Sequence, residues 1–202
     1  MKGHIGTAAF YDREADSYAA ATVGLDMSAD YARFLSRIRP GGWILDAGSG
    51  SGRDTLAFLD RGFEVSAFDA SPSMAACSSR LTGRTTLVRT FSDVDERDCY
   101  DGIWASASLL HVPDLELDDA WDRLVHALRV GGTIYASFKL GEGDAVAADG
   151  RLFHLLSERR LFAMVERHAL IDVDVAISAS MAGRRGDTWL SVVAGRRGLA
   201  AA

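Results

Sequence analysis

Short apolar runs alternate along this chain with longer segments whose apolar residues recur at helical spacing. The short runs predict strands over 43–47, 63–68, 86–90, 102–106, 133–138, 170–178 and 188–194. The longer segments predict helices over 28–38, 53–61, 72–81, 116–129 and 157–168. Such an alternation is typical of βαβ units built around a parallel sheet.

The clearest predicted helix is 116–129. Its apolar positions fall on one face, which we expect to pack on the sheet with Trp121 in the core. These positions are Leu117, Ala120, Trp121, Leu124, Val125 and Leu128.

The last two predicted strands are separated only by the polar, glycine-rich segment 180–187. A parallel pair of strands needs a long crossover, whereas an antiparallel pair needs only a short turn. We therefore expect a hairpin turn over 180–187 and an antiparallel pairing of 170–178 with 188–194.

A glycine-rich turn follows the first predicted strand, in the sequence Ile44-Leu45-Asp46-Ala47-Gly48-Ser49-Gly50-Ser51-Gly52-Arg53. Glycines at every second position allow a tight bend and a close approach of the backbone to a ligand. The helix behind the turn offers unpaired N–H groups and a partial positive charge. This pattern indicates a site for a nucleotide-like ligand.

Three kinds of glycine loop compete for this segment. A phosphate-binding P-loop needs Gly-Lys-Ser/Thr, but Gly52 is followed by Arg53-Asp54. The dinucleotide fingerprint Gly-x-Gly-x-x-Gly fails because position 53 is arginine. The third possibility rests on Asp46, whose carboxylate would repel a pyrophosphate but would suit a ligand with an ammonium and a sulfonium. That ligand is S-adenosylmethionine.

The segment from Asp46 to Gly52 resembles the first motif of the class I S-adenosylmethionine-dependent methyltransferases, Asp/Glu-x-Gly-x-Gly-x-Gly. The resemblance extends over about residues 10–195. It implies an α/β Rossmann-like fold with a seven-stranded, mostly parallel sheet, an antiparallel last strand and helices on both faces.

Three further segments carry this resemblance. In 63–72, Asp69 ends a predicted strand 19 residues after Gly50, a spacing typical of a carboxylate that accepts ribose hydroxyls. The segment 100–113 resembles the fourth strand and the loop over the methyl donor. The segment 128–138 resembles a helix end, a Gly-Gly turn and the fifth strand.

By resemblance, the backbone of the glycine turn faces the methionine tail of the cofactor, Asp46 lies near its ammonium and Asp69 binds its ribose. The loop after the third strand contacts the adenine, through Asp93 or through Ser92. The expected cofactor-binding residues are Tyr11, Tyr18, Asp46, Gly48, Ser49, Gly50, Asp69, Ala70, Ser92, Asp93 and Ala107.

His111 is the candidate catalytic residue because it follows the fourth predicted strand, where an acceptor would meet the methyl group. A neutral imidazole can orient or deprotonate an acceptor near physiological pH; alternatively, His111 holds its loop through hydrogen bonds. Lys139 either contacts an anionic acceptor or lies at the surface. His154 and Trp189 are further candidates for the acceptor side, although Trp189 also fits a place in the core.

Residues 1–27 precede the first predicted core helix and carry Tyr11 and Tyr18. The resembled family commonly folds such a segment over the cofactor as a lid, where aromatic rings attract a sulfonium. The alternative is an ordinary surface helix with its aromatic side chains packed inward. We expect a single domain, with 1–27 as the lid and 28–202 as the Rossmann-like core.

Net charge and chain length narrow the chemical class of the methyl acceptor. The chain has 202 residues and a formal net charge of −6, which argues against nucleic acid as a partner. Its length leaves little room for a separate substrate domain, so a small-molecule acceptor is the leading expectation. A tRNA or protein methyltransferase, a catalytically silent S-adenosylmethionine-binding protein and a nicotinamide-dependent enzyme are the alternatives.

The sequence contains two cysteines at no metal-like spacing, no signal-peptide pattern and no apolar run as long as a membrane span. We therefore expect a cytoplasmic protein without metal or membrane contact, as a monomer or homodimer. The glycine-turn resemblance extends to a tellurite-detoxifying type. It leaves open whether oxygen, nitrogen, sulfur or a metalloid receives the methyl group.

Overall fold

The computed structural model describes residues 2–179 and 187–198. Within them, nine strands form one sheet in the order β3-β2-β1-β4-β5-β7-β6, with β9 paired to both β5 and β8. The strands are β1 (Trp43–Ala47), β2 (Glu64–Asp69), β3 (Thr86–Val88), β4 (Tyr100–Ala105), β5 (Leu128–Leu140), β6 (Gly143–Val146), β7 (Leu152–Leu156), β8 (Ile171–Ala179) and β9 (Thr188–Gly195). The helices are α1 (Lys2–Thr22), α2 (Ser28–Leu35), α3 (Arg53–Leu59), α4 (Pro72–Thr82), α5 (Asp114–Ala127) and α6 (Glu158–Arg167), with 3₁₀ turns at Phe91–Asp93 (η1) and Leu109–His111 (η2).

The expected fold class is confirmed. Strands β1 to β5 pair in parallel, and β9 runs antiparallel to both β5 and β8. All seven predicted strands are present. The hairpin turn predicted between the last two strands falls mainly on residues 180–186, which lie outside the described residues.

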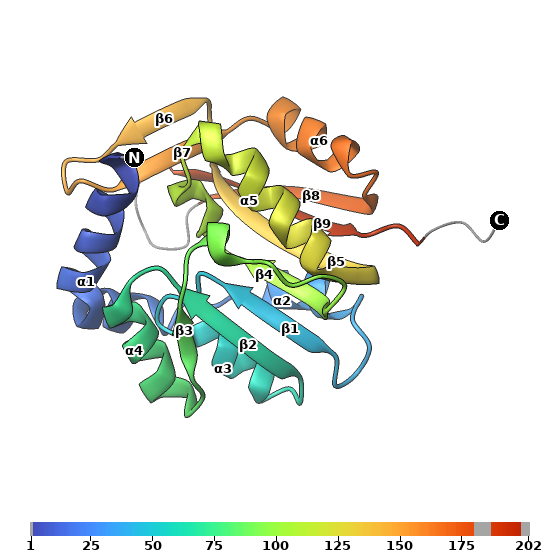
Figure 1. Ribbon diagram of the computed structural model, residues 1–202, viewed down its shortest axis with the longest axis horizontal. Coiled ribbons are helices and arrows are strands. Elements are labelled where there is room, and N and C mark those ends of the chain that lie inside the picture. The colour runs from blue at the N-terminus through green and yellow to red at the C-terminus, as the bar shows by residue number, and fades with distance from the viewer. Residues whose placement is uncertain (1, 180–186, 199–202) are drawn as a thin grey trace.

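The sheet is covered on both faces (Figure 1). Alternate residues of the central strands therefore enter two different cores. Ile44 and Trp104 pack with α2 and α3, whereas Leu45 and Ile103 belong to the core beneath α5 and α6. Trp121 of α5 is fully buried in that second core, as its helical spacing predicts.

The predicted helix 116–129 ends earlier than expected. Helix α5 stops at Ala127, and Leu128 begins β5 instead. The carbonyl oxygens of His126 and Ala127 accept hydrogen bonds from the backbone N–H groups of Asp98 and Cys99, so the chain leaves the helix there. The expected Gly-Gly turn lies inside β5, where Gly131 has a φ of +78° and the register with β4 shifts.

The seven-strand count is too low because β6 and β7 form an additional hairpin. Strand β7 pairs in parallel with Lys139 and Leu140 at the end of β5. Lys139 also pairs with Trp189 of β9, so the hairpin must occupy the opposite edge of β5, beyond the end of β4. The hairpin thus extends over the carboxyl ends of the strands.

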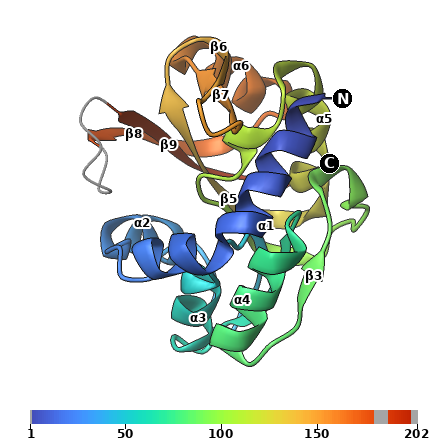
Figure 2. The same ribbon diagram turned by 90° about the vertical axis from the view of Figure 1, so that its left-hand side faces the viewer.

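Helix α1 is the other element that covers this edge. It is one continuous helix that packs against α4 on one side and β7 on the other (Figure 2). None of the described helices is both long and apolar enough to cross a bilayer.

Candidate active site

A cavity of about 1170 Å³ lies at the carboxyl ends of β1, β2, β4 and β5, beneath α1 and the β6–β7 hairpin. Most of the predicted cofactor ligands line it, namely Tyr11, Tyr18, Gly48, Ser49, Gly50, Asp69, Ala70, Ser92 and Ala107. His111, Lys139 and Trp189 also line it. Asp46, Asp93 and His154 do not.

The glycine turn is fixed by packing as well as by conformation. Gly48 has a φ of +84°, and a Cβ added there would lie 2.4 Å from the Cβ of Ser108. Gly52 has the same φ, and its Cβ would lie 2.8 Å from the Cα of Ser78. Gly50, at φ +53°, has only the methyl end of Met74 nearby, so its backbone faces the cavity.

Asp69 connects the tip of β2 to the glycine turn. Its Oδ2 accepts the backbone N–H of Gly50 at 2.9 Å, and its Oδ1 accepts that of Ser71 at 2.9 Å. Burial raises the pKa of Asp69, and these two hydrogen bonds oppose the rise. The two oxygens of a carboxylate together offer about four lone-pair sites, so these hydrogen bonds leave Asp69 capacity to accept another donor.

Asp46 lies behind the turn rather than in the cavity. It is 1% exposed, and its Oδ2 accepts a hydrogen bond from the hydroxyl of Thr55 at 2.6 Å. Burial, followed by the neighbouring charge of Asp54, raises the pKa of Asp46. That Asp46 lies near the ammonium of the cofactor stays a prediction. Because Asp46 lies behind the glycine turn, its carboxylate would act on the ammonium from across the turn.

Ser92 and Asp93 take different places in the loop after β3. The carboxylate of Asp93 accepts the backbone N–H and the hydroxyl of Thr90, both at 2.8 Å, and so caps the 3₁₀ turn η1. These hydrogen bonds lower the pKa of Asp93. Ser92 and Phe91 are the residues of η1 that line the cavity.

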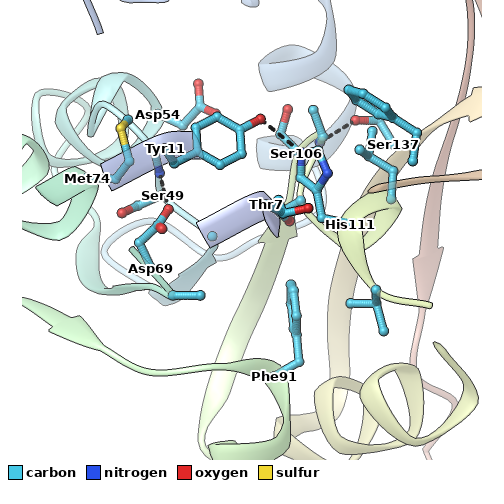
Figure 3. A pocket seen from close by; sticks show the side chains of 18 of the residues that line it. Thr7, Tyr11, Ser49, Asp54, Asp69, Met74, Phe91, Ser106, His111 and Ser137 are labelled. Carbon is cyan, nitrogen blue, oxygen red and sulfur yellow. Dashed lines mark hydrogen bonds between the residues drawn. The ribbon is translucent and has the colours of Figure 1, made fainter. Parts of the chain in front are cut away.

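His111 is held between α1 and β7. Its Nδ1 lies 2.6 Å from the carbonyl oxygen of Leu152, and its Nε2 lies 2.9 Å from the hydroxyl of Tyr11. Figure 3 shows the rings of Tyr11 and His111 meeting between Asp69 on one side and Ser137 on the other. Burial lowers the pKa of His111 to about 4, so the ring is neutral near pH 7. Because a carbonyl only accepts, Nδ1 carries the proton and Nε2 accepts from Tyr11.

Arg151 closes the cavity from the hairpin side, and it was not among the residues predicted from the sequence. Its guanidinium carbon lies 4.3 Å from the ring centre of Phe10 and 5.1 Å from that of Phe153. An ion pair of 2.7 Å with Asp149 neutralises it. No motif in the sequence marks Arg151, because its partners Phe10, Asp149 and Phe153 meet it only in the folded chain.

A second missed group surrounds Asp54 at the start of α3. The carboxylate of Asp54 accepts hydrogen bonds from Tyr31, from Trp104 Nε1 at 2.8 Å and from Arg53 Nε at 2.7 Å. The indole of Trp104 also stacks on Tyr135 at 3.8 Å. In the sequence, Arg53-Asp54 served only to exclude a P-loop. Its role depends on partners from α2 and β4, which local spacing does not reveal.

The three acceptor-side candidates separate in the structure. Lys139 lines the cavity and forms a 2.9 Å ion pair with Asp187. Trp189 lines it beside Lys139, its cross-strand partner. His154 is 3% exposed and lies 2.6 Å from Asp144, away from the lining residues.

Comparison with known proteins agrees with this architecture. A family model described as a methyltransferase domain matches residues 44–132. An uncharacterized methyltransferase of Staphylococcus carnosus is 25% identical over 179 residues, which cover 83% of this chain and 86% of the relative.

Two solved structures show the same fold. The Burkholderia thailandensis 1,6-didemethyltoxoflavin-N1-methyltransferase, bound to 1,6-didemethyltoxoflavin and S-adenosylhomocysteine, aligns with a TM-score of 0.76 and 22% identity, over 94% of this chain and 85% of its own. Phosphoethanolamine N-methyltransferase 2 of Haemonchus contortus, in complex with S-adenosyl-L-methionine, aligns with a TM-score of 0.71 and 15% identity, over 94% and 60%. The two structures share the fold of this chain, and the family match, the relative and the glycine turn support its resemblance to the class I S-adenosylmethionine-dependent methyltransferases.

Proposed function

We propose that this enzyme transfers the methyl group of S-adenosylmethionine to a small molecule that is enclosed with the cofactor. The cavity beneath α1 and the β6–β7 hairpin carries this proposal. Its volume of about 1170 Å³ exceeds the roughly 300–1,000 Å³ typical of a pocket for one small ligand. A second compact molecule therefore has room beside the cofactor.

The residues on the donor side fit the cofactor. The free acceptor sites of Asp69 suit a ribose, and the backbone at Gly48–Gly50 leaves space for the methionine tail without a Cβ. Ser92 and Phe91 would border the adenine, and Tyr11 and Tyr18 would present ring faces to the sulfonium. When bound, S-adenosylmethionine supplies an electrophilic methyl group with a neutral leaving group.

We assign His111 a positioning role toward the acceptor. With a pKa of about 4, its imidazole is neutral but weakly basic, so it is better suited to hold a hydrogen bond than to remove a proton. Its Nδ1–H stays on the Leu152 carbonyl while Nε2 accepts from Tyr11 or from an acceptor that takes the place of the phenol. Correct placement of a nucleophile can supply most of the acceleration.

We also propose that α1 is the lid of this cavity. Tyr11 reaches His111, the hydroxyl of Thr7 accepts the Leu152 N–H at 2.9 Å, and Asp12 accepts the Ser71 hydroxyl at 2.5 Å. Because α1 covers the site, its displacement would admit the acceptor. A covered site of this kind favours a compact acceptor over a nucleic acid or a protein.

The free thiols of Cys77 and Cys99 suit the reducing cytoplasm.

The donor half is tested by titration calorimetry with S-adenosylmethionine, S-adenosylhomocysteine and NAD. We expect both adenosyl ligands to bind and NAD to be rejected. Asp69→Ala should weaken S-adenosylhomocysteine at least 10-fold because its ribose hydroxyls lose their acceptors. The control Asp60→Ala, at the far end of α3, should leave affinity unchanged.

The acceptor half is tested by adding purified protein and labelled S-adenosylmethionine to a cell extract. We expect the label in the low-molecular-mass fraction, unaffected by ribonuclease or protease. Label confined to RNA or protein would refute the small-molecule proposal. Tight cofactor binding without any labelled product would instead indicate a catalytically silent protein.

A further inference from the structure

The floor of the acceptor side is formed by alternate residues of β5 and β9. Ser137 and Lys139 line the cavity from β5, and their cross-strand partners Ser191 and Trp189 line it from β9. Figure 3 shows Ser137 on the opposite side of His111 from Asp69. Lys139 lies two residues, or about 7 Å, farther along the strand and so extends the floor away from the donor side.

The polar groups on this floor retain hydrogen-bond donors. The ammonium of Lys139 has three N–H groups, and among the described residues it has one ion pair, with Asp187 at 2.9 Å. It also lies 4.2 Å from the ring centre of Phe153. The hydroxyl of Ser191 accepts from Arg33 Nη1 at 2.9 Å, which leaves its own proton to donate.

The carboxylates near this floor already have cationic partners. Asp187 is paired with Lys139, and Asp30 lies 3.0 Å from Arg33 Nη1. Lys139 keeps 16% of its side-chain surface exposed and lines the cavity. Beyond its ion pair with Asp187, Lys139 has further N–H groups, and Ser191 has its hydroxyl proton; an anionic oxygen is a partner that both donors could share.

The charge of Lys139 also reaches the reacting side. After burial, the positive charges of Arg151 and Lys139 contribute to the lowered pKa of His111. An anion beside Lys139 would therefore lie within electrostatic range of His111.

We infer that the acceptor carries an anionic oxygen group, a carboxylate or a phosphate, which seats on Lys139 and Ser191 while its nucleophilic atom faces His111. This inference rests on the proposed small-molecule function. It concerns how the acceptor is held and leaves the identity of the methylated atom open.

The test uses protein saturated with S-adenosylhomocysteine and four probes: benzoate, phenyl phosphate, benzamide and benzylamine. Affinities are measured by calorimetry or by saturation-transfer NMR. We expect benzoate, phenyl phosphate or both to bind, which separates the two anion types, and benzamide and benzylamine to bind at least 10-fold more weakly.

Variants of Lys139 and Ser191 test whether these two residues bind the anionic group. Lys139→Met keeps the apolar stem but removes the charge, and should weaken the anionic probe at least 10-fold. Lys139→Arg should retain most of the affinity, and Ser191→Ala should lose several-fold. Arg84→Met removes an exposed cation between α4 and β3 and should change nothing.

The outcomes are distinct. Preferential binding of benzylamine would point to Asp187 and overturn the inference, as would binding of neither anion or an unchanged affinity in Lys139→Met. If Lys139→Met fails to fold, the Ser191→Ala and Lys139→Arg measurements decide. Failure of S-adenosylhomocysteine itself to bind would refute the proposed function instead.

Discussion

Gly48 is a single residue at which conformation and packing both exclude a side chain. It has a φ of +84°, and a Cβ would lie 2.4 Å from Ser108. Gly62 has a nearly identical φ of +83° but no atom within 4 Å of its Cβ position. Substitution of Gly62 would therefore introduce backbone strain alone, whereas substitution of Gly48 would introduce backbone strain and a steric clash.

We expect Gly48→Ala to reduce the free energy of unfolding by about 1–3 kcal/mol more than Gly62→Ala does, the range typical of overpacking. Urea denaturation of both variants measures the difference. Equal losses would show that only the left-handed conformation matters at this turn.

His111 makes the stability of the protein depend on pH. Its folded pKa of about 4 lies below the unfolded value of about 6.5, so the unfolded chain binds the proton first. Between those pH values the contribution is lost as pH falls, and it is fully present above pH 6.5. The contribution amounts to at most about 3.4 kcal/mol for a shift of this size.

We expect the fall in the free energy of unfolding between pH 6.5 and 4 to be smaller in His111→Gln than in the wild-type protein. Chemical denaturation at several pH values measures it. His126→Gln, at an exposed position of α5, should keep the wild-type pH dependence. If both variants matched the wild type, His111 would not be the group responsible.

Among elements, helix α1 packs on α4 through Ala15, Met74 and Cys77, and one carboxylate of α1 contacts the first turn of α4. Asp12 accepts the Ser71 hydroxyl at 2.5 Å and the Ser73 N–H at 3.1 Å, at the first turn of α4. Asp16, one turn along α1, makes an exposed 3.0 Å ion pair with Arg80. Exposed pairs contribute little, whereas capping groups contribute about 0.5–2 kcal/mol.

We therefore expect Asp12→Ala to accelerate amide hydrogen exchange in α1 and to lower its local stability by about 1 kcal/mol. Asp16→Ala should leave exchange in α1 within error of the wild type. Exchange of the amides in β1 and β4 should not respond to either variant, and a global acceleration would show that α1 does not open independently of the core.

The elements that the sequence predicted are those whose apolar periodicity matches burial on one or two faces of the sheet. The β6–β7 hairpin was not predicted because Gly143–Val146 is fully exposed and gains its strand conformation from pairing with β7. The predicted helix 116–129 was too long at its end because Leu128 continues the helical spacing of the apolar residues. The helix ends before Leu128 because the carbonyl groups of the preceding residues accept hydrogen bonds from Asp98 and Cys99. These two residues are distant in sequence from the helix, so its apolar spacing does not reveal them.

At the scale of the whole molecule, cofactor binding should stabilise the protein through linkage. A ligand that binds only the folded state adds about 2.7 kcal/mol at 100 times its Kd. We expect S-adenosylhomocysteine at that concentration to raise the free energy of unfolding by about this amount, as measured by denaturation, and NAD to have no effect. Asp69→Ala should lose the gain at the same ligand concentration.

More of the proposed donor side than of the proposed acceptor side could be predicted from the sequence. The glycine turn and Asp69 follow from local spacing, because one βαβ unit contains both. The acceptor half joins α1, η2, β5, β7 and β9, which are distant in sequence and meet only in the folded chain. Arg151 and Asp187 therefore carried no recognisable motif.

The position of the β6–β7 hairpin has a consequence for evolution and engineering. Among the described residues, its pairing with the central sheet is at Lys139 and Leu140, and it lies in the sequence between β5 and α6, outside the βαβ unit that contains the glycine turn and Asp69. At Leu152, both the contact to His111 and the contact to Thr7 are made by the backbone. We therefore expect that a hairpin of equal length that preserves the backbone at 152 can replace β6–β7 and change the proposed acceptor range, while the glycine turn stays unaltered.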